Sequence, residues 1–285
     1  MRTYRELVNN GTIELETAGV YAGFARVLML ELLREQDLDM FTVFQEEASD
    51  EFAASYDEKI KLLSQDIPLG YVLGYEWFYG YKFTVNEDVL IPRSETEELV
   101  GHVLSDIDTY FENPVIADVA CGSGAIGIAL SLETGLPVIS SDISEEALVV
   151  AEKNAKDNNA KVEFVAGDML DPIIERGVKL DVLVCNPPYI KNTEHIQTSV
   201  LNNEPHVALF GGEDGLFFYR RVLEKADQIL NDKAMIAFEI GFDIGDSVVA
   251  LAQHYFPTAK VVLRQDINRL DRMVFVYKGI NHIGD

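Results

Sequence analysis

Basic residues, cysteine and long apolar runs are all scarce in this chain of 285 residues. Lys and Arg number 23 against 48 Asp and Glu, which gives a formal net charge of -25 at pH 7. A molecule of this sign repels a polyanion as a whole, so the composition argues against direct binding of nucleic acid. Residues 1–90 hold 7 basic and 17 acidic side chains, so that region hides no basic surface either.

The two cysteines, Cys121 and Cys185, are too few for a disulfide scaffold. They also lack the paired spacing of a zinc site, so we expect reduced thiols and no metal. The N-terminal residues include no apolar leader core, and no stretch of about 18 residues is apolar enough to cross a bilayer. We therefore expect a cytoplasmic protein that has no membrane partner.

Helical and strand patterns divide the chain into three parts. In residues 1–67, apolar side chains recur at three- and four-residue spacing, which predicts a small helical bundle. Residues 68–92 are rich in aromatic and β-branched residues with glycines between them, and they predict a β-hairpin linker. Residues 93–285 begin with a predicted helix from Glu95 to Asp108, after which strands alternate with helices.

The strand-like runs of the third part are almost continuously apolar and are mostly separated by helices. This pattern predicts a parallel sheet whose two faces are both covered. The last two runs are joined by a link too short for a helical crossover, so that pair should be antiparallel. We predict an α/β fold with a Rossmann-like sheet of seven mostly parallel strands and a C-terminal antiparallel hairpin. The predicted strands are residues 115–120, 137–142, 161–168, 180–185, 234–240, 260–266 and 272–278.

A glycine-rich segment follows the first of these strands. Gly122, Gly124 and Gly127 have the spacing that allows a tight turn and brings a ligand close to backbone N–H groups. Asp142 closes the second strand about 20 residues on, where a carboxylate can accept hydrogen bonds from ribose hydroxyls. Asp168 ends the third strand at the same rim. Together these residues predict an adenosine site, which fits both a dinucleotide and S-adenosylmethionine.

The fourth strand ends on the four residues Asn186, Pro187, Pro188 and Tyr189. Proline has no N–H and holds its predecessor extended, so the chain leaves the sheet with carbonyls that no neighbouring N–H can claim. The side-chain oxygen of Asn186 and the carbonyl of Pro187 can then hold both hydrogens of a planar NH2 group. Tyr189 would form a flat wall beside that group. This clamp, with Asp118 upstream of the glycines, favours S-adenosylmethionine over a dinucleotide.

The chain resembles the release factor glutamine methyltransferases, which are protein-(glutamine-N5) methyltransferases. The resemblance covers nearly the whole chain and is carried by PLGYVLGYEWFYG, VLIPRSETEELV, DVACGSGAIGIA, NPPYI, NEPHVALFGGEDGL and FEIG. It implies an N-terminal domain of five helices that recognises the substrate, and a class I S-adenosylmethionine-dependent methyltransferase domain. It also implies methylation of N5 of the glutamine in the Gly-Gly-Gln (GGQ) motif of peptide-chain release factors, which modulates translation termination. We expect the enzyme to act as a monomer.

Matched position by position, the resemblance implies the residues that serve the cofactor and the substrate. The glutamine site corresponds to Asn186, Pro187, Pro188 and Tyr189, and of these Asn186, Pro187 and Tyr189 would act in catalysis. Two residues depart from the family pattern. Ala120 stands where glycine is frequent, and Ser94 stands where proline is usual. With Asp168 from the pattern above, the predicted cofactor contacts are Ala120, Cys121, Gly122, Ser123, Gly124, Asp142, Asp168, Met169 and Asn186.

Three alternative functions stay open at this point. The sequence PRS at residues 92–94 also occurs in a sister family that methylates a ribosomal-protein glutamine. The NPPY motif is shared with enzymes that methylate N6 of adenine or N2 of guanine, and such an enzyme would flip a base into the same clamp. It would bind RNA or DNA with a steep salt dependence. A catalytically silent adaptor would bind S-adenosylmethionine and yield no methylated product.

Overall fold

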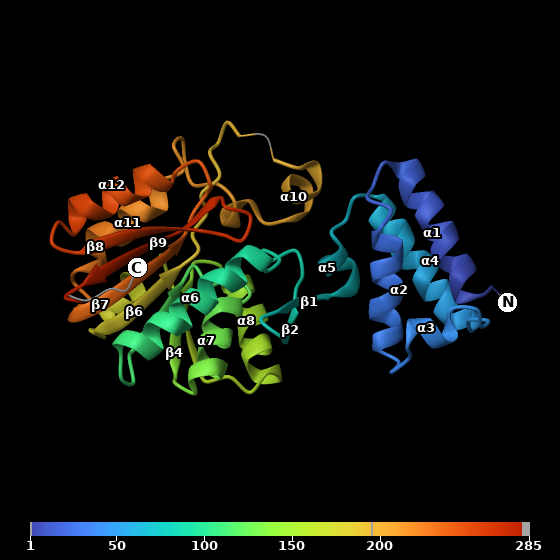
Figure 1. Ribbon diagram of the computed structural model, residues 1–285, viewed down its shortest axis with the longest axis horizontal. Helices are drawn as coiled ribbons and strands as arrows, with labels where there is room; N and C mark the ends of the chain where they lie inside the picture. The colour runs from blue at the N-terminus through green and yellow to red at the C-terminus, as the bar shows by residue number, and fades with distance from the viewer. Residues whose placement is uncertain (1, 195, 281–285) are drawn as a thin grey trace. The chain divides into compact units, whose positions relative to one another are not determined.

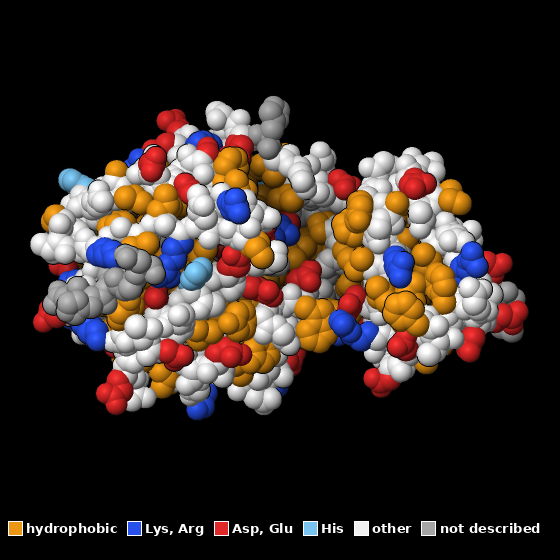
Figure 2. All heavy atoms as spheres, in the orientation of Figure 1, with side chains coloured by type: hydrophobic (Ala, Val, Ile, Leu, Met, Phe, Trp, Pro, Cys, Tyr) orange, Lys and Arg blue, Asp and Glu red, His pale blue; other side chains and the backbone are white. Residues whose placement is uncertain are grey.

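The computed structural model describes residues 2–194 and 196–280, and it divides the chain into two compact units (Figure 1). Within the described residues, the first unit comprises residues 2–75 and 196–203, and the second comprises the rest. No helix in the described ranges is long and apolar enough to cross a membrane. Figure 2 shows acidic side chains scattered over the visible surface of each unit, in keeping with the net charge.

The first unit is a helical bundle. Its first helix begins at a capping box, in which the Thr3 hydroxyl accepts from Glu6 N and the Glu6 carboxylate accepts from Thr3 N. The core is closed by the fully buried Tyr56, whose hydroxyl donates to the Ala25 carbonyl at 2.8 Å. The helices are α1 (Tyr4–Ala18), α2 (Phe24–Arg34), α3 (Met40–Val43), α4 (Asp50–Ser64), α5 (Leu69–Leu73) and α10 (Thr198–Asn203).

The hairpin expected over residues 68–92 occupies only the middle of that range. Before it, α5 begins directly after Pro68 and ends at Gly74, whose φ of 81° is a left-handed C-cap. A proline at the start and a glycine at the end are strong helix boundaries, and they outweigh the β propensity of the residues between them. The two strands are β1 (Tyr75–Phe78) and β2 (Tyr81–Thr84).

The second unit is built on one seven-stranded sheet with the strand order β5-β4-β3-β6-β7-β9-β8. Neighbours from β5 to β7 pair in parallel, and β9 is antiparallel to both β7 and β8. The predicted sheet, mostly parallel with a C-terminal antiparallel hairpin, is therefore confirmed. Its strands are β3 (Ile116–Val119), β4 (Val138–Asp142), β5 (Val162–Ala166), β6 (Leu180–Cys185), β7 (Leu230–Glu239), β8 (Lys260–Gln265) and β9 (Asp271–Lys278).

Helices cover both faces of this sheet, which explains why its central strands are apolar on both sides. On one face Ile236 packs with Tyr219 and with Val248, from α11 and α12. On the other face Val184 packs with apolar residues of α6 and α7, among them Val103. The helices of this unit are α6 (Ser94–Tyr110), α7 (Ala125–Thr134), α8 (Glu145–Asp157), α9 (Asp171–Glu175), the 3-10 helix η1 (His206–Ala208), α11 (Phe217–Ala226) and α12 (Gly245–Tyr255).

The strand order places the site. From β3 the chain runs outward through β4 to β5, and it then returns to place β6 on the other side of β3. The order therefore reverses between β3 and β6, and in open α/β sheets ligands bind at such a reversal, beyond the carboxyl ends of the strands. The loops after β3, β4, β5 and β6 all reach this edge.

Candidate active site

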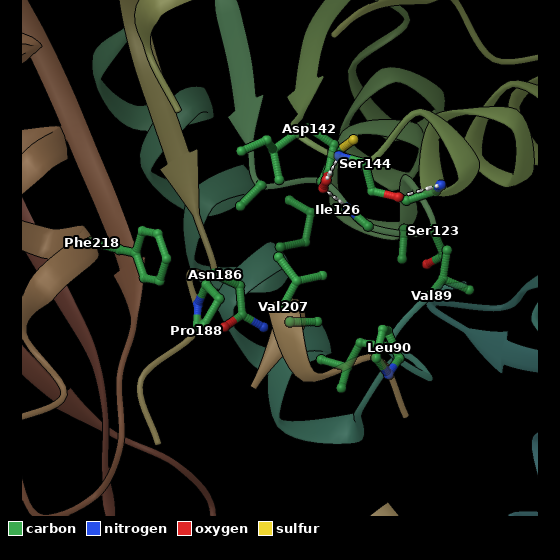
Figure 3. A pocket seen from close by; sticks show the side chains of 18 of the residues that line it. Val89, Leu90, Ser123, Ile126, Asp142, Ser144, Asn186, Pro188, Val207 and Phe218 are labelled. Atoms are coloured by element: carbon green, nitrogen blue, oxygen red, sulfur yellow. Dashed lines mark hydrogen bonds between the residues drawn. The ribbon is translucent and has the colours of Figure 1, made fainter. Parts of the chain in front are cut away.

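A cavity of about 320 Å³ lies at the carboxyl ends of β3, β4, β5 and β6 (Figure 3). Its walls come from the segment before α6, the four loops that follow these strands, η1 and the start of α11. Figure 3 shows Asn186 and Pro188 on one side of the hollow and Ser123 on the opposite side, with Asp142 at the top of the view. Apart from a few polar groups the lining is apolar, which is typical of a small-molecule site.

Most of the site residues predicted from the sequence meet in this cavity. Three do not line it, for different reasons. Gly124 is the N-cap of α7 with a φ of 79°, Pro187 is buried, and Tyr189 packs against the core on the α11 and α12 side of the sheet. The predicted residues that line the cavity are Ala120, Cys121, Gly122, Ser123, Asp142, Asp168, Met169, Asn186 and Pro188.

The loop between β3 and α7 is a tight turn in which several residues have left-handed backbone conformations. Ala120 has a φ of 58° and Gly122 a φ of 52°. Gly124 N donates to the Cys121 carbonyl at 2.8 Å, which closes the turn. A Cβ at Gly122 would meet no atom within 4 Å, so this side of the loop faces open space. An alanine in the left-handed region is strained by about 1 kcal/mol, which explains why glycine suits position 120.

Asp142, at the end of β4, is anchored by the loops on either side of it. Its Oδ2 accepts from Gly122 N at 2.8 Å, and its Oδ1 accepts from Ser144 N at 3.0 Å. Burial raises the pKa of Asp142, and these N–H groups offset part of that rise. Each carboxylate oxygen has a second lone pair, so the side chain can still accept from a ribose hydroxyl.

Asp118 lies beneath the glycine-rich loop and is completely buried. Its Oδ2 accepts from Gly127 N at 2.9 Å, whereas Oδ1 has no hydrogen-bond partner among the described residues. Burial raises the pKa of Asp118 to about 8. A Cβ at Gly127 would lie 2.4 Å from Ser140 Oγ and 3.1 Å from Asp118 Oδ2, so only glycine fits this contact. The third glycine of the motif therefore serves helix packing against the sheet.

Both cysteines are buried, and neither forms a disulfide. Burial raises the pKa of the Cys121 thiol and of the Cys185 thiol well above the ordinary value, and the nearby Asp118 and Asp142 carboxylates add to the rise. Both side chains are therefore protonated thiols near neutral pH. A neutral buried thiol is a poor nucleophile, so neither cysteine is suited to covalent catalysis.

Asp168 forms an ion pair that the sequence pattern did not predict. Arg221 Nη2, from α11, lies 2.5 Å from Asp168 Oδ2, and both side chains line the cavity. The Arg221 guanidinium also lies 5.7 Å from the centre of the Phe217 ring. Residue 221 is far from residue 168 in sequence and has no motif around it, so only the tertiary fold reveals this pair.

The Asn186 side chain is oriented by Thr96. Asn186 Nδ2 lies 3.4 Å from Thr96 Oγ1, which in turn donates to Glu239 Oε2 at 2.6 Å. Within the described part of the chain, Asn186 Oδ1 and the Pro187 carbonyl accept no hydrogen bond. Both oxygens thus keep their capacity to accept a hydrogen bond.

The backbone that follows Asn186 is held by the glycine-rich segment before α11. Ile190 N donates to the Leu209 carbonyl at 3.0 Å, and Gly211 N donates back to the Ile190 carbonyl at 2.8 Å. A Cβ at Gly211 would lie 2.6 Å from the Pro188 carbonyl oxygen, so this close approach requires glycine. These contacts leave the Asn-Pro-Pro-Tyr turn little freedom.

An ion pair between a partly exposed arginine and a buried glutamate lies at the rim of the cavity. Arg93 Nη2 lies 2.5 Å from Glu204 Oε1, and the other oxygen of Glu204 accepts from Ile91 N at 3.3 Å. Glu204 is almost fully buried, whereas Arg93 is partly exposed and lines the cavity. The pair joins the segment before α6 to the segment before η1. Neither residue was singled out from the sequence as a site residue.

The sheet order is that of the class I methyltransferase fold. The methyltransferase small domain family matches residues 98–212. A methyltransferase from Pyrococcus furiosus has a TM-score of 0.53 at 17% identity, with 71% of this chain and 91% of that chain covered. The T. thermophilus 16S rRNA N2 G1207 methyltransferase, solved with AdoMet and guanosine, has a TM-score of 0.51 at 14% identity, with 72% and 49% covered. At these identities the two structures show a shared fold.

Sequence relatives give the particular family. A release factor glutamine methyltransferase of Bacillus anthracis is 43% identical over 280 residues, which cover 96% of this chain and 99% of the relative. The Bacillus subtilis enzyme of the same name is 38% identical, with 96% and 97% covered. The Staphylococcus aureus enzyme is 32% identical, with 96% and 99% covered. The chain belongs to the release factor glutamine methyltransferase family, and the resemblance stated from its motifs is confirmed.

Proposed function

We propose that the chain transfers the methyl group of S-adenosylmethionine to the N5 side-chain amide of the glutamine in the GGQ motif of peptide-chain release factors. Membership of the family supports this substrate class. The observation that carries the proposal is Asn186 Oδ1, which accepts no hydrogen bond among the described residues and belongs to a side chain that lines the cavity. The carbonyl of the adjacent Pro187 accepts no hydrogen bond there either. Methylation of this glutamine in the cytoplasm would modulate translation termination.

The residues of the cavity fit S-adenosylmethionine. The open side of the loop at Gly122 leaves room for a ligand against the backbone, and Asp142 presents a carboxylate to a ribose. Asp168 and Met169 lie at the end of β5, where the adenine would be held, and Ile126 adds an apolar wall. The bound cofactor supplies a methyl group on a positively charged sulfonium. An apolar, water-poor lining suits a transition state in which that charge disperses.

The chain's own residues orient the acceptor. A carboxamide nitrogen is a poor nucleophile because its lone pair is delocalised into the carbonyl. Asn186 Oδ1 and the Pro187 carbonyl would each accept one N–H of the substrate amide, which aims the nitrogen at the methyl carbon. Transfer of the methyl group would leave the cofactor sulfur as a neutral thioether and would make the alkylated substrate nitrogen acidic, so its extra proton would pass to solvent at the mouth of the cavity. No side chain in the clamp needs to act as a strong base.

The helical unit is the proposed recognition domain, and residues 1–67 would contact the release factor. It exposes large apolar side chains, among them Tyr21 at 71% and Phe41 at 87%. Figure 2 shows apolar side chains on the visible face of this unit. Exposed aromatic side chains of this kind are frequent anchors of protein partners. We propose residues 68–92 as the linker and residues 93–285 as the methyltransferase domain, in an enzyme that acts as a monomer.

A panel of acceptors tests the substrate. The enzyme and labelled S-adenosylmethionine are incubated separately with a release factor, its Gly-Gly-Gln→Gly-Gly-Ala variant, a ribosomal protein, RNA and DNA. We expect label only in the unmodified release factor. Label in the Gly-Gly-Ala variant, or faster labelling of nucleic acid or of the ribosomal protein, contradicts the proposal. Ser94 is exposed and does not line the cavity, so its departure from the family pattern should not change this result.

A further inference from the structure

A buried threonine and a buried glutamate lie behind Asn186. Thr96, in the first turn of α6, is 5% exposed, and Glu239, the last residue of β7, is 2% exposed. Thr96 Oγ1 donates to Glu239 Oε2 at 2.6 Å and lies 3.4 Å from Asn186 Nδ2. These two contacts form a hydrogen-bonded chain from the central sheet to the proposed acceptor of the substrate amide.

The threonine hydroxyl fixes which atom donates and which accepts in each of these two hydrogen bonds. A threonine hydroxyl has one hydrogen, and here that hydrogen is donated to the Glu239 carboxylate. Toward Asn186 the hydroxyl can then only accept, so it selects the NH2 end of the asparagine amide. The opposite end of that amide, Oδ1, is left to face away from Thr96. Without the carboxylate, the hydroxyl could donate instead, and the amide could turn over.

We propose that Glu239, acting through Thr96, is the positioning residue that keeps the side-chain oxygen of Asn186 directed toward the substrate amide. This inference rests on the proposed function, because it assigns a role to the support of the proposed clamp. Both residues lie far from the Asn-Pro-Pro-Tyr motif in the sequence. Thr96 itself lines the cavity, whereas Glu239 is not among its lining residues.

Thr96 donates to Glu239 only if the glutamate is ionised. The groups around Glu239 shift its pKa in both directions. Burial raises the pKa of Glu239, and the nearby Glu95 carboxylate acts in the same sense. The hydrogen bond from Thr96, the Arg272 guanidinium and the hydroxyl of Tyr189 act in the opposite sense. Tyr189 Oη lies 3.4 Å from Glu239 Oε1, so the second carboxylate oxygen is also engaged. Both oxygens of the glutamate thus have donors.

A pair of substitutions at position 96 separates the hydroxyl from the shape of the side chain. Thr96→Val keeps the branched shape and removes the hydroxyl, whereas Thr96→Ser keeps the hydroxyl. In steady-state methylation of a release factor, we expect kcat of Thr96→Val to fall between about 10- and 100-fold, because the reacting groups lose their alignment. KM for the release factor should stay within about twofold of the wild type, because the substitution does not change the contacts that hold the substrate in the ground state.

Thr96→Ser should restore kcat to near the wild-type value, and Thr109→Val serves as a control on the same helix. The Thr109 hydroxyl donates only to the Ser105 carbonyl and is exposed, so that variant should keep full activity. If Thr96→Val turns over at the wild-type rate, the inference is overturned. It is equally overturned if Thr96→Ser is as slow as Thr96→Val, because the position would then matter for packing alone.

Glu239→Leu gives a second test that does not depend on the folding of the Thr96 variants. Leucine removes the acceptor of the Thr96 hydrogen, so the hydroxyl can donate toward Asn186 and the asparagine amide can turn over. We expect kcat to fall as it does in Thr96→Val, and wild-type kcat would contradict the inference. If Asn186→Ala is inactive while these variants are fully active, only the inference fails. If Asn186→Ala itself has wild-type kcat, the proposed clamp fails as well.

Discussion

Replacing Asp118 by asparagine should change the way in which stability depends on pH. In the native state burial raises the pKa of this carboxyl from 3.8 to about 8. Between these values the native Asp118 holds a proton that the unfolded chain has already released. The native state then binds more protons than the unfolded state, so the free energy of unfolding falls as pH rises toward the native pKa.

The size of the effect follows from the same shift. One proton of difference changes the free energy of unfolding by about 1.4 kcal/mol for each pH unit. From about pH 5 to about pH 8, the Asp118 contribution should therefore cost the wild type about 4 kcal/mol. Asp118→Asn is isosteric, cannot ionise, and keeps an oxygen that can accept from Gly127 N. Carboxyl groups elsewhere titrate in both proteins and cancel in the difference.

Urea unfolding of both proteins at several pH values measures this difference directly. Relative to the wild type, Asp118→Asn should gain stability steadily as pH rises, and the gain should level off above the native pKa. If the difference in unfolding free energy between the two proteins is constant across this range, Asp118 is not the buried neutral acid described here. A gain on acidification would reverse the sign and contradict the reasoning as well.

Three further substitutions test other parts of the site. Ala120→Gly relieves the strain of an alanine with a left-handed backbone conformation and should stabilise the protein by about 0.5 kcal/mol in urea unfolding. A loss of stability would show that the backbone at Ala120 is not strained. Gly211→Ala places a Cβ 2.6 Å from the Pro188 carbonyl oxygen, so the turn must shift and kcat should fall by more than about tenfold in the methylation assay. An unchanged kcat would show that the turn need not be rigid. Arg93→Met removes the cation beside the buried Glu204 carboxylate, and since the Arg93 side chain is 38% exposed and screened by solvent, the protein should lose only about 1 kcal/mol in urea unfolding. No loss of stability would contradict the role of the pair.

The sheet could be predicted from the sequence because its strands are continuous apolar runs that end in recognisable turns. Each of the seven expected runs overlaps a strand, and the short link before β9 correctly indicated an antiparallel pair. Helix α5 was missed, because aromatic and β-branched residues suggested strand while Pro68 and Gly74 set helix boundaries. Local propensity is a weak guide where turn chemistry opposes it.

The cavity residues that follow strands could also be predicted, since parallel strands bring their carboxyl ends to one edge. Residues that support the site from helices could not, because no spacing pattern links them to it. Arg221 and Thr96 lie far from their partners in sequence, and only the packed fold brings them together. Glu239 did carry a clue, since it is an acidic residue at the end of the buried apolar run 234–238, where an unpaired charge is costly.

The central claim is that Asn186 and Pro187 orient the substrate amide, and the Asn186→Ala variant tests it most directly. Methyl incorporation into a release factor and binding of the same factor are measured side by side for the variant and the wild type. The account predicts that incorporation is abolished while binding of the release factor is largely retained. Incorporation at the wild-type rate would contradict it.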